Sequence, residues 1–137
     1  MSVGGDARVR VVVADDHPSI RENLKYILSV EPDMLVVAVA RDGAEAVRTA
    51  LAHRPDVIVV DADMPILDGL QVTIRLRREA PEICVILYTA TTEVCGVAYA
   101  AGAFGCVAKD APMEVLIQAS ATAPPMSPSA ARWPPFP

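Results

Sequence analysis

Acidic residues follow two apolar segments of this chain, at the point where each segment ends. Asp61 comes directly after the β-branched residues 57–60, and Asp15 and Asp16 follow the valine-rich residues 8–14. Such segments are typical of strands buried on both faces of a parallel sheet. Open α/β folds bind ligands at the carboxyl edge of the sheet, where parallel strands end together. We therefore expect these three carboxylates to share one site.

Three carboxylates in one site can bind a divalent cation, and one of them can act as a nucleophile. Without a cation their mutual repulsion favours protonation of at least one of them. Oxygen ligands without Cys or His favour Mg²⁺, which retains waters and accepts phosphate oxygens. We expect Asp15 and Asp16 to orient the ion, and Asp61 to be both ligand and nucleophile. The backbone carbonyl of Asp63 is the predicted further ligand. Attack by Asp61 on a phosphoryl donor gives an aspartyl phosphate.

Two later apolar segments end in a hydroxyl and an ammonium group. Thr89 follows residues 83–88, and Lys109 follows residues 104–108. Phosphoryl transfer depends on positioning and charge stabilisation of the moving oxygens. We expect Lys109 to pair with phosphoryl oxygens and the Thr89 hydroxyl to donate a hydrogen bond to them.

The elements that position these residues alternate along the chain. Strands are expected at residues 8–14, 34–40, 57–60, 83–88 and 104–108, and helices end near residues 29 and 53 and span residues 70–78, 93–101 and 112–120. This alternation predicts an α/β fold with a doubly wound, five-stranded parallel sheet and five helices. In the flavodoxin-like strand order 2-1-3-4-5, the first and third strands are neighbours, about 5 Å apart.

Composition limits the classes of function. The 137 residues are 53% hydrophobic and 21% charged, which suits one globular domain. A net charge of −5 argues against nonspecific binding to nucleic acid or to an anionic membrane. No apolar run reaches membrane-spanning length, and the first residues do not resemble a signal peptide. These features predict a cytoplasmic protein without a membrane partner.

The end of the chain differs from the rest. Six of the twelve prolines fall in residues 121–137, so we expect a domain over residues 1–120 followed by a disordered tail. Trp133 and Phe136 could anchor a peptide ligand there, but a neutral extension is the preferred interpretation.

The three cysteines are widely spaced and have no partners in a metal-binding pattern. We expect Cys84, Cys95 and Cys106 to be reduced, small and buried rather than bound to metal or joined in a disulfide.

The motifs resemble the receiver domain of response regulators, the CheY-like phosphoacceptor of two-component signalling. Asp15-Asp16 is similar to the family's acidic pair, and Asp61, in Asp-Ala-Asp-Met-Pro, is similar to its phosphorylated aspartate. Thr89-Ala90 is similar to the switch threonine and its small neighbour, and Lys109 to the invariant lysine. The resemblance covers about residues 8–120.

The sequences Asp-Asp-His-Pro and Ala-Lys-Asp are most similar to the NarL/LuxR-type branch of that family. Members of this branch usually carry a C-terminal helix-turn-helix domain, and we expect none after Ser120. The resemblance implies a phosphoacceptor in transcription regulation rather than an enzyme, with slow autodephosphorylation. Asp61 would accept its phosphoryl group from a sensor histidine kinase with Mg²⁺.

The output face implied by the resemblance comprises the fourth helix, fifth strand and fifth helix. Residues 94–104 carry almost no charge, which indicates either contact with a partner or a second copy in a homodimer, or burial under the C-terminal segment. The family commonly has Tyr or Phe three residues before the lysine, where this chain has Cys106, with Phe104 expected on the same strand face. A thiol is too small to report movement of the threonine by ring burial, which puts the usual coupling in question.

Three alternatives remain open at this level. Asp61-Ala-Asp63 matches the Asp-x-Asp start of haloacid-dehalogenase-type phosphatases, although those enzymes place it on their first strand. A receiver fold could also act as a phosphorylation-independent dimerisation or adaptor module. His17 could serve in a phosphorelay, but a polar loop residue is the preferred interpretation.

Overall fold

The computed structural model describes residues 8–123, so most of the predicted tail lies outside the described residues. The elements follow one another as β1 (Val9–Ala14), α1 (Pro18–Ser29), β2 (Met34–Ala40), α2 (Gly43–His53), β3 (Val57–Asp61), α3 (Gly69–Glu79), β4 (Cys84–Thr89), the 3-10 helix η1 (Thr92–Val94), α4 (Cys95–Ala100), β5 (Gly105–Ala108) and α5 (Met113–Ala121). All strand pairs are parallel, in the order β2-β1-β3-β4-β5. This arrangement confirms the predicted fold class and strand order.

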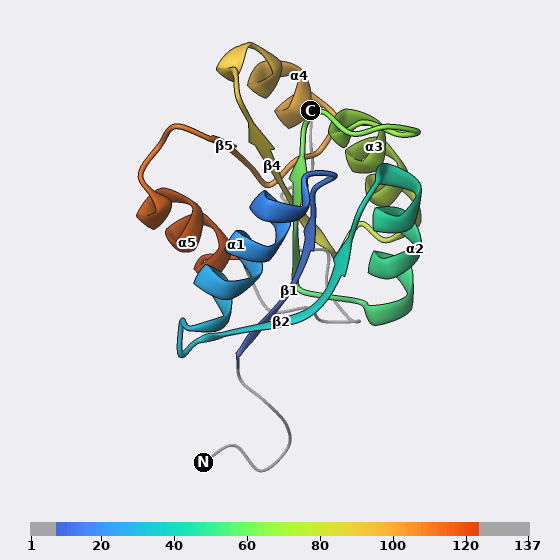
Figure 1. Ribbon diagram of the computed structural model, residues 1–137. Coiled ribbons are helices and arrows are strands. Elements are labelled where there is room, and N and C mark those ends of the chain that lie inside the picture. Colours follow the sequence, from blue (N-terminus) through green and yellow to red (C-terminus); the bar gives the residue numbers. More distant parts are fainter. Residues whose placement is uncertain (1–7, 124–137) are drawn as a thin grey trace.

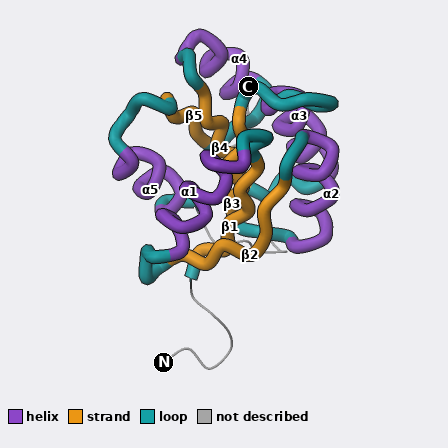
Figure 2. The backbone as a smooth tube through the Cα atoms, in the orientation of Figure 1, coloured by secondary structure: helices purple, strands orange, loops and turns teal. Residues whose placement is uncertain are grey.

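Helices cover both faces of the sheet, as Figures 1 and 2 show, with α1 and α5 on one side and α2 and α3 on the other. Alternate residues of the central strands divide between two apolar cores. Val59 packs with Leu24 of α1 and Leu116 of α5, whereas Ile58 packs with Leu76 of α3. Every residue of β3 is buried, which explains its continuous apolar sequence.

The fourth helix is attached through a smaller apolar cluster. Ala98 of α4 packs with Leu87 and Ala103, and Leu70 of α3 lies against the same cluster. This places α4 on the side of the sheet that carries α3. Ala98 is the one buried residue of the six-residue helix α4.

A capping box fixes the start of α3 next to the end of β3. The Asp68 carboxylate accepts a hydrogen bond from the Gln71 backbone N–H, and the Gln71 side chain accepts one from the Asp68 N–H. A Cβ atom at Gly69 would lie 2.6 Å from the Asp61 carbonyl oxygen. Glycine is therefore required here, because α3 begins in direct contact with the backbone that carries Asp61.

Two predictions for the fifth strand and the cysteines were wrong. Cys95 and Cys106 form a disulfide between α4 and β5, while Cys84 is a buried thiol in β4. The fold brings together two residues separated by 11 positions, which the spacing alone did not indicate. Phe104 packs against the core shared with α1 and α5, whereas Cys106 packs with the α4 cluster. Strand alternation does not extend to Phe104, because β5 begins at Gly105.

No helix within residues 8–123 combines the length and the apolar character that a membrane crossing needs.

Candidate functional site

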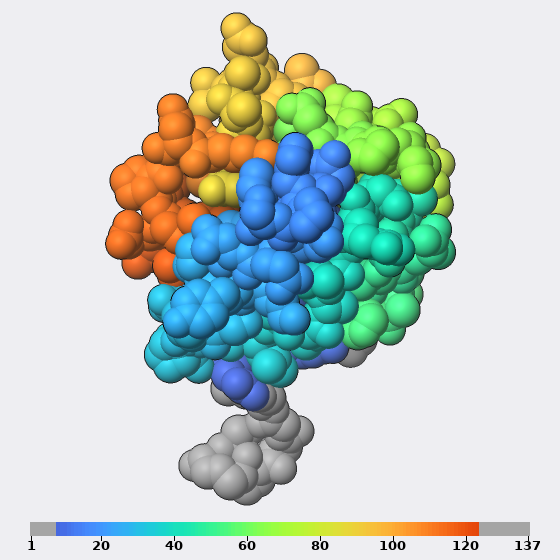
Figure 3. Space-filling model, in the orientation of Figure 1, coloured from blue at the N-terminus to red at the C-terminus, as the bar shows by residue number. Residues whose placement is uncertain are grey.

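The predicted acids meet at the carboxyl edge of the sheet. Ala14 of β1 pairs with Val60 of β3, so Asp15 and Asp61, which follow them, lie side by side at the end of the sheet. One ligand atom each from Asp15, Asp16, Asp61 and the adjacent His17 lie within 4.8 Å of one another. In Figure 3 the loop that follows β1, in dark blue, lies beside the green surface of the loop that follows β3.

The acids are withdrawn from water to different extents. The side chains of Asp15 and Asp61 are 0% and 1% exposed, whereas that of Asp16 is 30% exposed. Within the described residues, Oδ2 of Asp15, Oδ1 of Asp16 and Oδ2 of Asp61 are buried and accept no hydrogen bond. Buried carboxylate oxygens usually have partners, so three such atoms in one cluster form a site that suits a cation.

Lys109 extends from the end of β5 into the acidic cluster. Its Nζ lies 2.8 Å from Oδ1 of Asp61 and 3.8 Å from Oδ2 of Asp15. The ammonium also lies 5.8 Å from the centre of the Tyr88 ring, within cation–π range. The lysine therefore balances part of the negative charge while it contacts the predicted nucleophile.

The surroundings of the site raise the pKa values of Asp15 and Lys109. Burial raises the pKa of Asp15, and the Asp61 charge raises it further against the opposing effects of the His17 N–H and Lys109. Burial alone lowers the pKa of Lys109, but the hydrogen bond to Asp61 and the nearby acids outweigh it and raise this pKa. The site therefore disfavours a charged Asp15 and favours a charged Lys109.

Thr89 ends β4 next to the lysine. The Lys109 backbone N–H donates to the Thr89 carbonyl oxygen at 2.6 Å. The buried Thr89 hydroxyl donates to the Thr91 carbonyl oxygen at 2.8 Å and accepts from the Thr91 N–H at 3.2 Å. Its proton therefore points into the segment that leads to α4, and a hydrogen bond to a phosphoryl oxygen requires the hydroxyl to turn.

The loop after β3 supports the predicted nucleophile. The Asp63 backbone N–H donates to Oδ1 of Asp61 at 3.2 Å, while its side chain is exposed. This contact orients the Asp61 carboxylate.

His17 belongs to the cluster although it was not among the predicted site residues. Its backbone N–H donates to Oδ1 of Asp15 at 2.9 Å, and its ring Nδ1 lies 3.1 Å from Oδ1 of Asp16. The side chain is 61% exposed, which suits a residue at the entrance to the site. Arg21 donates to the Asp15 carbonyl oxygen at 2.8 Å and so also holds this loop. In the sequence, the position of His17 directly after the two acids could have indicated that it belongs to the site. No sequence feature indicated a role for Arg21.

The residues present fit a magnesium ion. Carboxylate oxygens are the ligands that Mg²⁺ prefers, and buried oxygens without hydrogen bonds are available on Asp15, Asp16 and Asp61. Burial and then the Asp61 charge raise the pKa of Asp15, and a bound cation would offset both effects.

The comparisons with known proteins agree with this geometry. Residues 11–121 match the model of the response regulator receiver domain family. The chain belongs to this family: its fold and site are those of a phosphoacceptor receiver domain.

The chain is similar to receivers of the NarL/LuxR-type branch, as its motifs predicted. The NarL signal receiver domain of Mycobacterium tuberculosis is 38% identical, with a TM-score of 0.77 over 82% of this chain and 92% of that one. The oxygen regulatory protein NreC of Staphylococcus epidermidis is 38% identical over 83% of this chain and 54% of its own length. A protein-glutamate methylesterase/protein-glutamine glutaminase of Caldanaerobacter subterraneus is 45% identical over 63% of this chain and 23% of its own. The chain thus spans about a quarter to a half of these two curated relatives.

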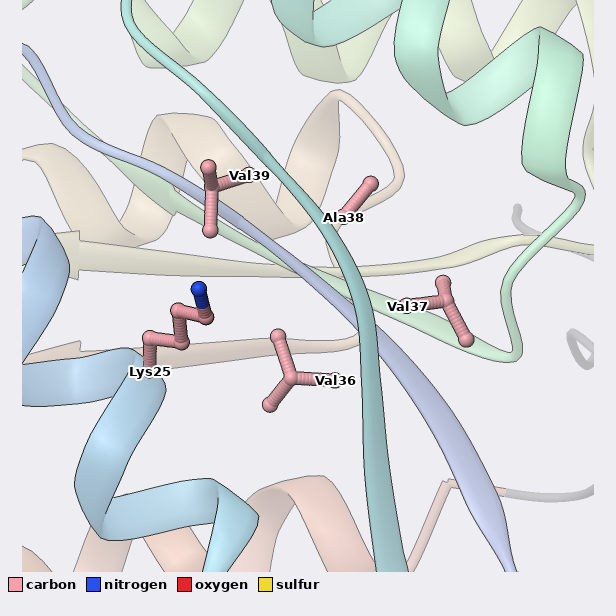
Figure 4. A pocket seen from close by; sticks show the side chains of 5 residues that line it. All are labelled: Lys25, Val36, Val37, Ala38 and Val39. Atoms are coloured by element: carbon pink, nitrogen blue, oxygen red, sulfur yellow. The ribbon is translucent and has the colours of Figure 1, made fainter.

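A separate hollow of about 210 Å³ lies along the edge strand β2. Its lining consists of one cation and four small apolar residues: Lys25, Val36, Val37, Ala38 and Val39 (Figure 4). Because none of the site residues lines it, we assign it no part in the chemistry above.

Proposed function

We propose that this domain accepts a phosphoryl group on Asp61 from a sensor histidine kinase and uses it to change an interaction face. The observation that carries the proposal is the contact between the buried Asp61 carboxylate and the Lys109 ammonium, beside Asp15 and Asp16. One Asp61 oxygen is buried without a hydrogen bond and is the proposed nucleophilic atom.

Each residue of the site has a proposed role. Asp15, Asp16, Asp61 and the Asp63 carbonyl would hold Mg²⁺, which when bound neutralises charge on the carboxylates and the phosphoryl oxygens. Lys109 pairs with a phosphoryl oxygen and so stabilises charge that develops during transfer. Thr89 turns its hydroxyl from the Thr91 carbonyl to the phosphoryl group, which pulls the segment before α4. This role makes the domain a phosphoacceptor with slow autodephosphorylation.

Acetyl phosphate tests the acceptor directly. With Mg²⁺, intact-mass measurement should show one acid-labile phosphoryl adduct on the wild type and none on Asp61→Asn, because the amide lacks the nucleophilic oxygen. The matched control is Asp63→Asn, which should still form the adduct because only the backbone of residue 63 is used. Absence of an adduct on the wild type would reject the proposal.

The same pair of variants distinguishes the proposed phosphoacceptor from the phosphatase alternative. A haloacid-dehalogenase-type enzyme would need the second acid for turnover, but the Asp63 side chain is exposed. We expect no hydrolysis of a generic phosphomonoester by the wild type. Turnover that Asp63→Asn abolishes would favour the enzyme.

The proposed interaction face includes α4, β5 and α5, where large apolar side chains are exposed. Val97 is 55% exposed, Tyr99 46% and Val115 45%. The proposed occupant is a protein partner or a second copy of this chain, rather than nucleic acid or membrane. Association that is equal with and without beryllofluoride, a phosphoryl mimic, would favour the phosphorylation-independent adaptor. We further propose that the protein is cytoplasmic and acts in the control of transcription.

A further inference from the structure

We propose that Cys95 and Cys106 are a reversible thiol–disulfide modification site that controls how firmly α4 is held to β5. The residues lie at the first position of α4 and in the middle of β5, with a Cα–Cα distance of 5.6 Å. This distance lies within the usual range for a disulfide, so the pair can close without movement of either backbone.

The pair is accessible to small molecules, unlike the third cysteine. Cys95 and Cys106 are both half-buried, whereas Cys84 is 0% exposed inside the main core. A thiolate must reach a sulfur of its reaction partner for exchange to occur, so exposure decides which cysteines react. The chain therefore contains one reactive pair and one protected thiol that serves as an internal reference.

Few other interactions hold α4 in place. Ala98 is its one buried residue, and within residues 8–123 its cluster contains two other buried side chains, Leu87 and Ala103. The Cys106 backbone N–H donates to the Tyr99 hydroxyl at 3.1 Å, which adds one hydrogen bond between α4 and β5. An element with so few buried contacts opens at low free energy, so the disulfide is a large part of its attachment.

The disulfide also restrains the segment from Thr89 to Cys95. Cys106 pairs in register with Leu87, two residues before Thr89 on β4, and Cys95 directly follows η1. The segment from Thr89 to Cys95 therefore runs between the sheet and a point that is covalently joined to the sheet. In the disulfide form it has little freedom to follow a movement of Thr89; in the dithiol form α4 can move with it.

The chemical step is thiol–disulfide exchange with a small-molecule disulfide. The two S–H bonds of the protein and the S–S bond of the reagent break, and the Cys95–Cys106 bond forms. The electron pair passes to the reagent, which leaves as two thiols with the two protons, and excess thiol reverses the step. Disulfides in reducing compartments are usually transient and redox-sensing, which fits a reversible role in the proposed cytoplasmic location.

Redox titration of the folded wild type tests the site. After equilibration in buffers of reduced and oxidised glutathione and trapping by alkylation, peptide mapping should show Cys95 and Cys106 change state together: both are alkylated in the reduced form, and both are joined and unalkylated in the oxidised form. Cys84 should be alkylated only after unfolding. Independent alkylation of the two cysteines at every ratio would overturn the proposal, and so would a bond that excess dithiothreitol does not reduce in the folded protein.

Hydrogen exchange tests the effect on α4. Amides of residues 95–101 should exchange at least about fivefold faster in the reduced than in the oxidised wild type, with α2 amides unchanged. The Cys95→Ser/Cys106→Ser double variant should match the reduced protein and ignore the redox buffer, whereas Cys84→Ser should respond as the wild type does. Equal exchange of α4 in both redox states would show that the bond does not hold the helix.

The coupling to Thr89 rests on the proposed function, but the modification site does not. Beryllofluoride should speed exchange in α4 more in the reduced form than in the oxidised form, and equal responses would reject the coupling. If acetyl phosphate labels neither form, the proposed function fails while the redox titration still decides the modification site.

Discussion

At the scale of single residues, the site contains buried and mutually repelling carboxylates, and a bound cation would reduce this unfavourable energy. Asp15 is fully buried beside Asp61, and Lys109 contacts Asp61 more closely than Asp15. Burial, and then the Asp61 charge, raise the pKa of Asp15. Proton uptake by Asp15 therefore adds to the free energy of unfolding. This contribution is fully present below the ordinary pKa of 3.8 and is lost as the pH rises through the raised pKa.

Asp15→Asn should therefore stabilise the domain at neutral pH in the absence of divalent cations, by about 1 kcal/mol. The amide oxygen can still accept from the His17 N–H, while the repulsion from Asp61 disappears. Urea unfolding followed by circular dichroism should show this gain shrink as the pH falls through the raised pKa of Asp15 toward its ordinary value of 3.8, because the wild-type group then takes up a proton. Added Mg²⁺ should stabilise the wild type more than the variant.

Asp63→Asn is the control for the loss of one carboxylate near the site, and its stability should change by less than about 0.5 kcal/mol because the side chain is exposed. A lower unfolding free energy for Asp15→Asn at neutral pH without cations would contradict the electrostatic account.

At the scale of elements, the contact between α3 and the end of β3 positions the proposed nucleophile. The approach is possible because Gly69 has no side chain. By contrast, a Cβ atom at Gly96 of α4 meets no atom within 4 Å. These two helical glycines allow the same substitution to be compared with and without a close neighbour.

Gly69→Ala should destabilise the domain by about 1–3 kcal/mol, because the methyl group would press on the Asp61 carbonyl and on Leu87. It should also slow labelling by acetyl phosphate through displacement of Asp61. Gly96→Ala should stabilise by about 0.5–1 kcal/mol, because alanine is the better helix former. Thermal unfolding of both variants would measure the difference, and effects of the same sign would refute the contact argument.

At the scale of the whole molecule, the acidic site and the proposed interaction face occupy different parts of the domain. The acids lie where β1 and β3 end, while Val97 and Val115 lie exposed on α4 and α5. The β4 strand, the Thr89 segment and α4 connect them. An effect of phosphorylation that passes from Thr89 to α4 therefore crosses the segment that the disulfide restrains.

Val97→Asp should reduce phosphoryl-dependent association of the domain, at least about tenfold in dissociation constant, by placing a charge in the apolar face. Light scattering with beryllofluoride and Mg²⁺, under reducing conditions, would measure the mass of the wild type and the variant. Tyr26→Asp is the matched control, because Tyr26 is also exposed, at 68%, but lies on α1. An equal loss in both variants would place the contact elsewhere.

Local chemistry made much of this protein predictable. Uninterrupted β-branched runs are typical of strands buried on both faces of a parallel sheet, and acids directly after such strands lie at its carboxyl edge. This pattern predicted that Asp15, Asp16 and Asp61 meet beside Lys109, and the structure brings them together. The strand order came from the flavodoxin-like fold that the alternation of strands and helices predicted, and it was confirmed.

What only the tertiary structure decided depends on distances between elements that no local pattern encodes. The disulfide arose because the start of α4 comes beside the middle of β5, and Phe104 changed faces because β5 begins one residue later than the pattern indicated. Ile66 has a φ of 74°, which is unfavourable for a β-branched residue, and it lies in a tight turn where the Leu67 N–H donates to the Pro65 carbonyl oxygen at 2.9 Å. Sequence periodicity reports which face of an element is buried, whereas packing between elements determines which side chains meet there.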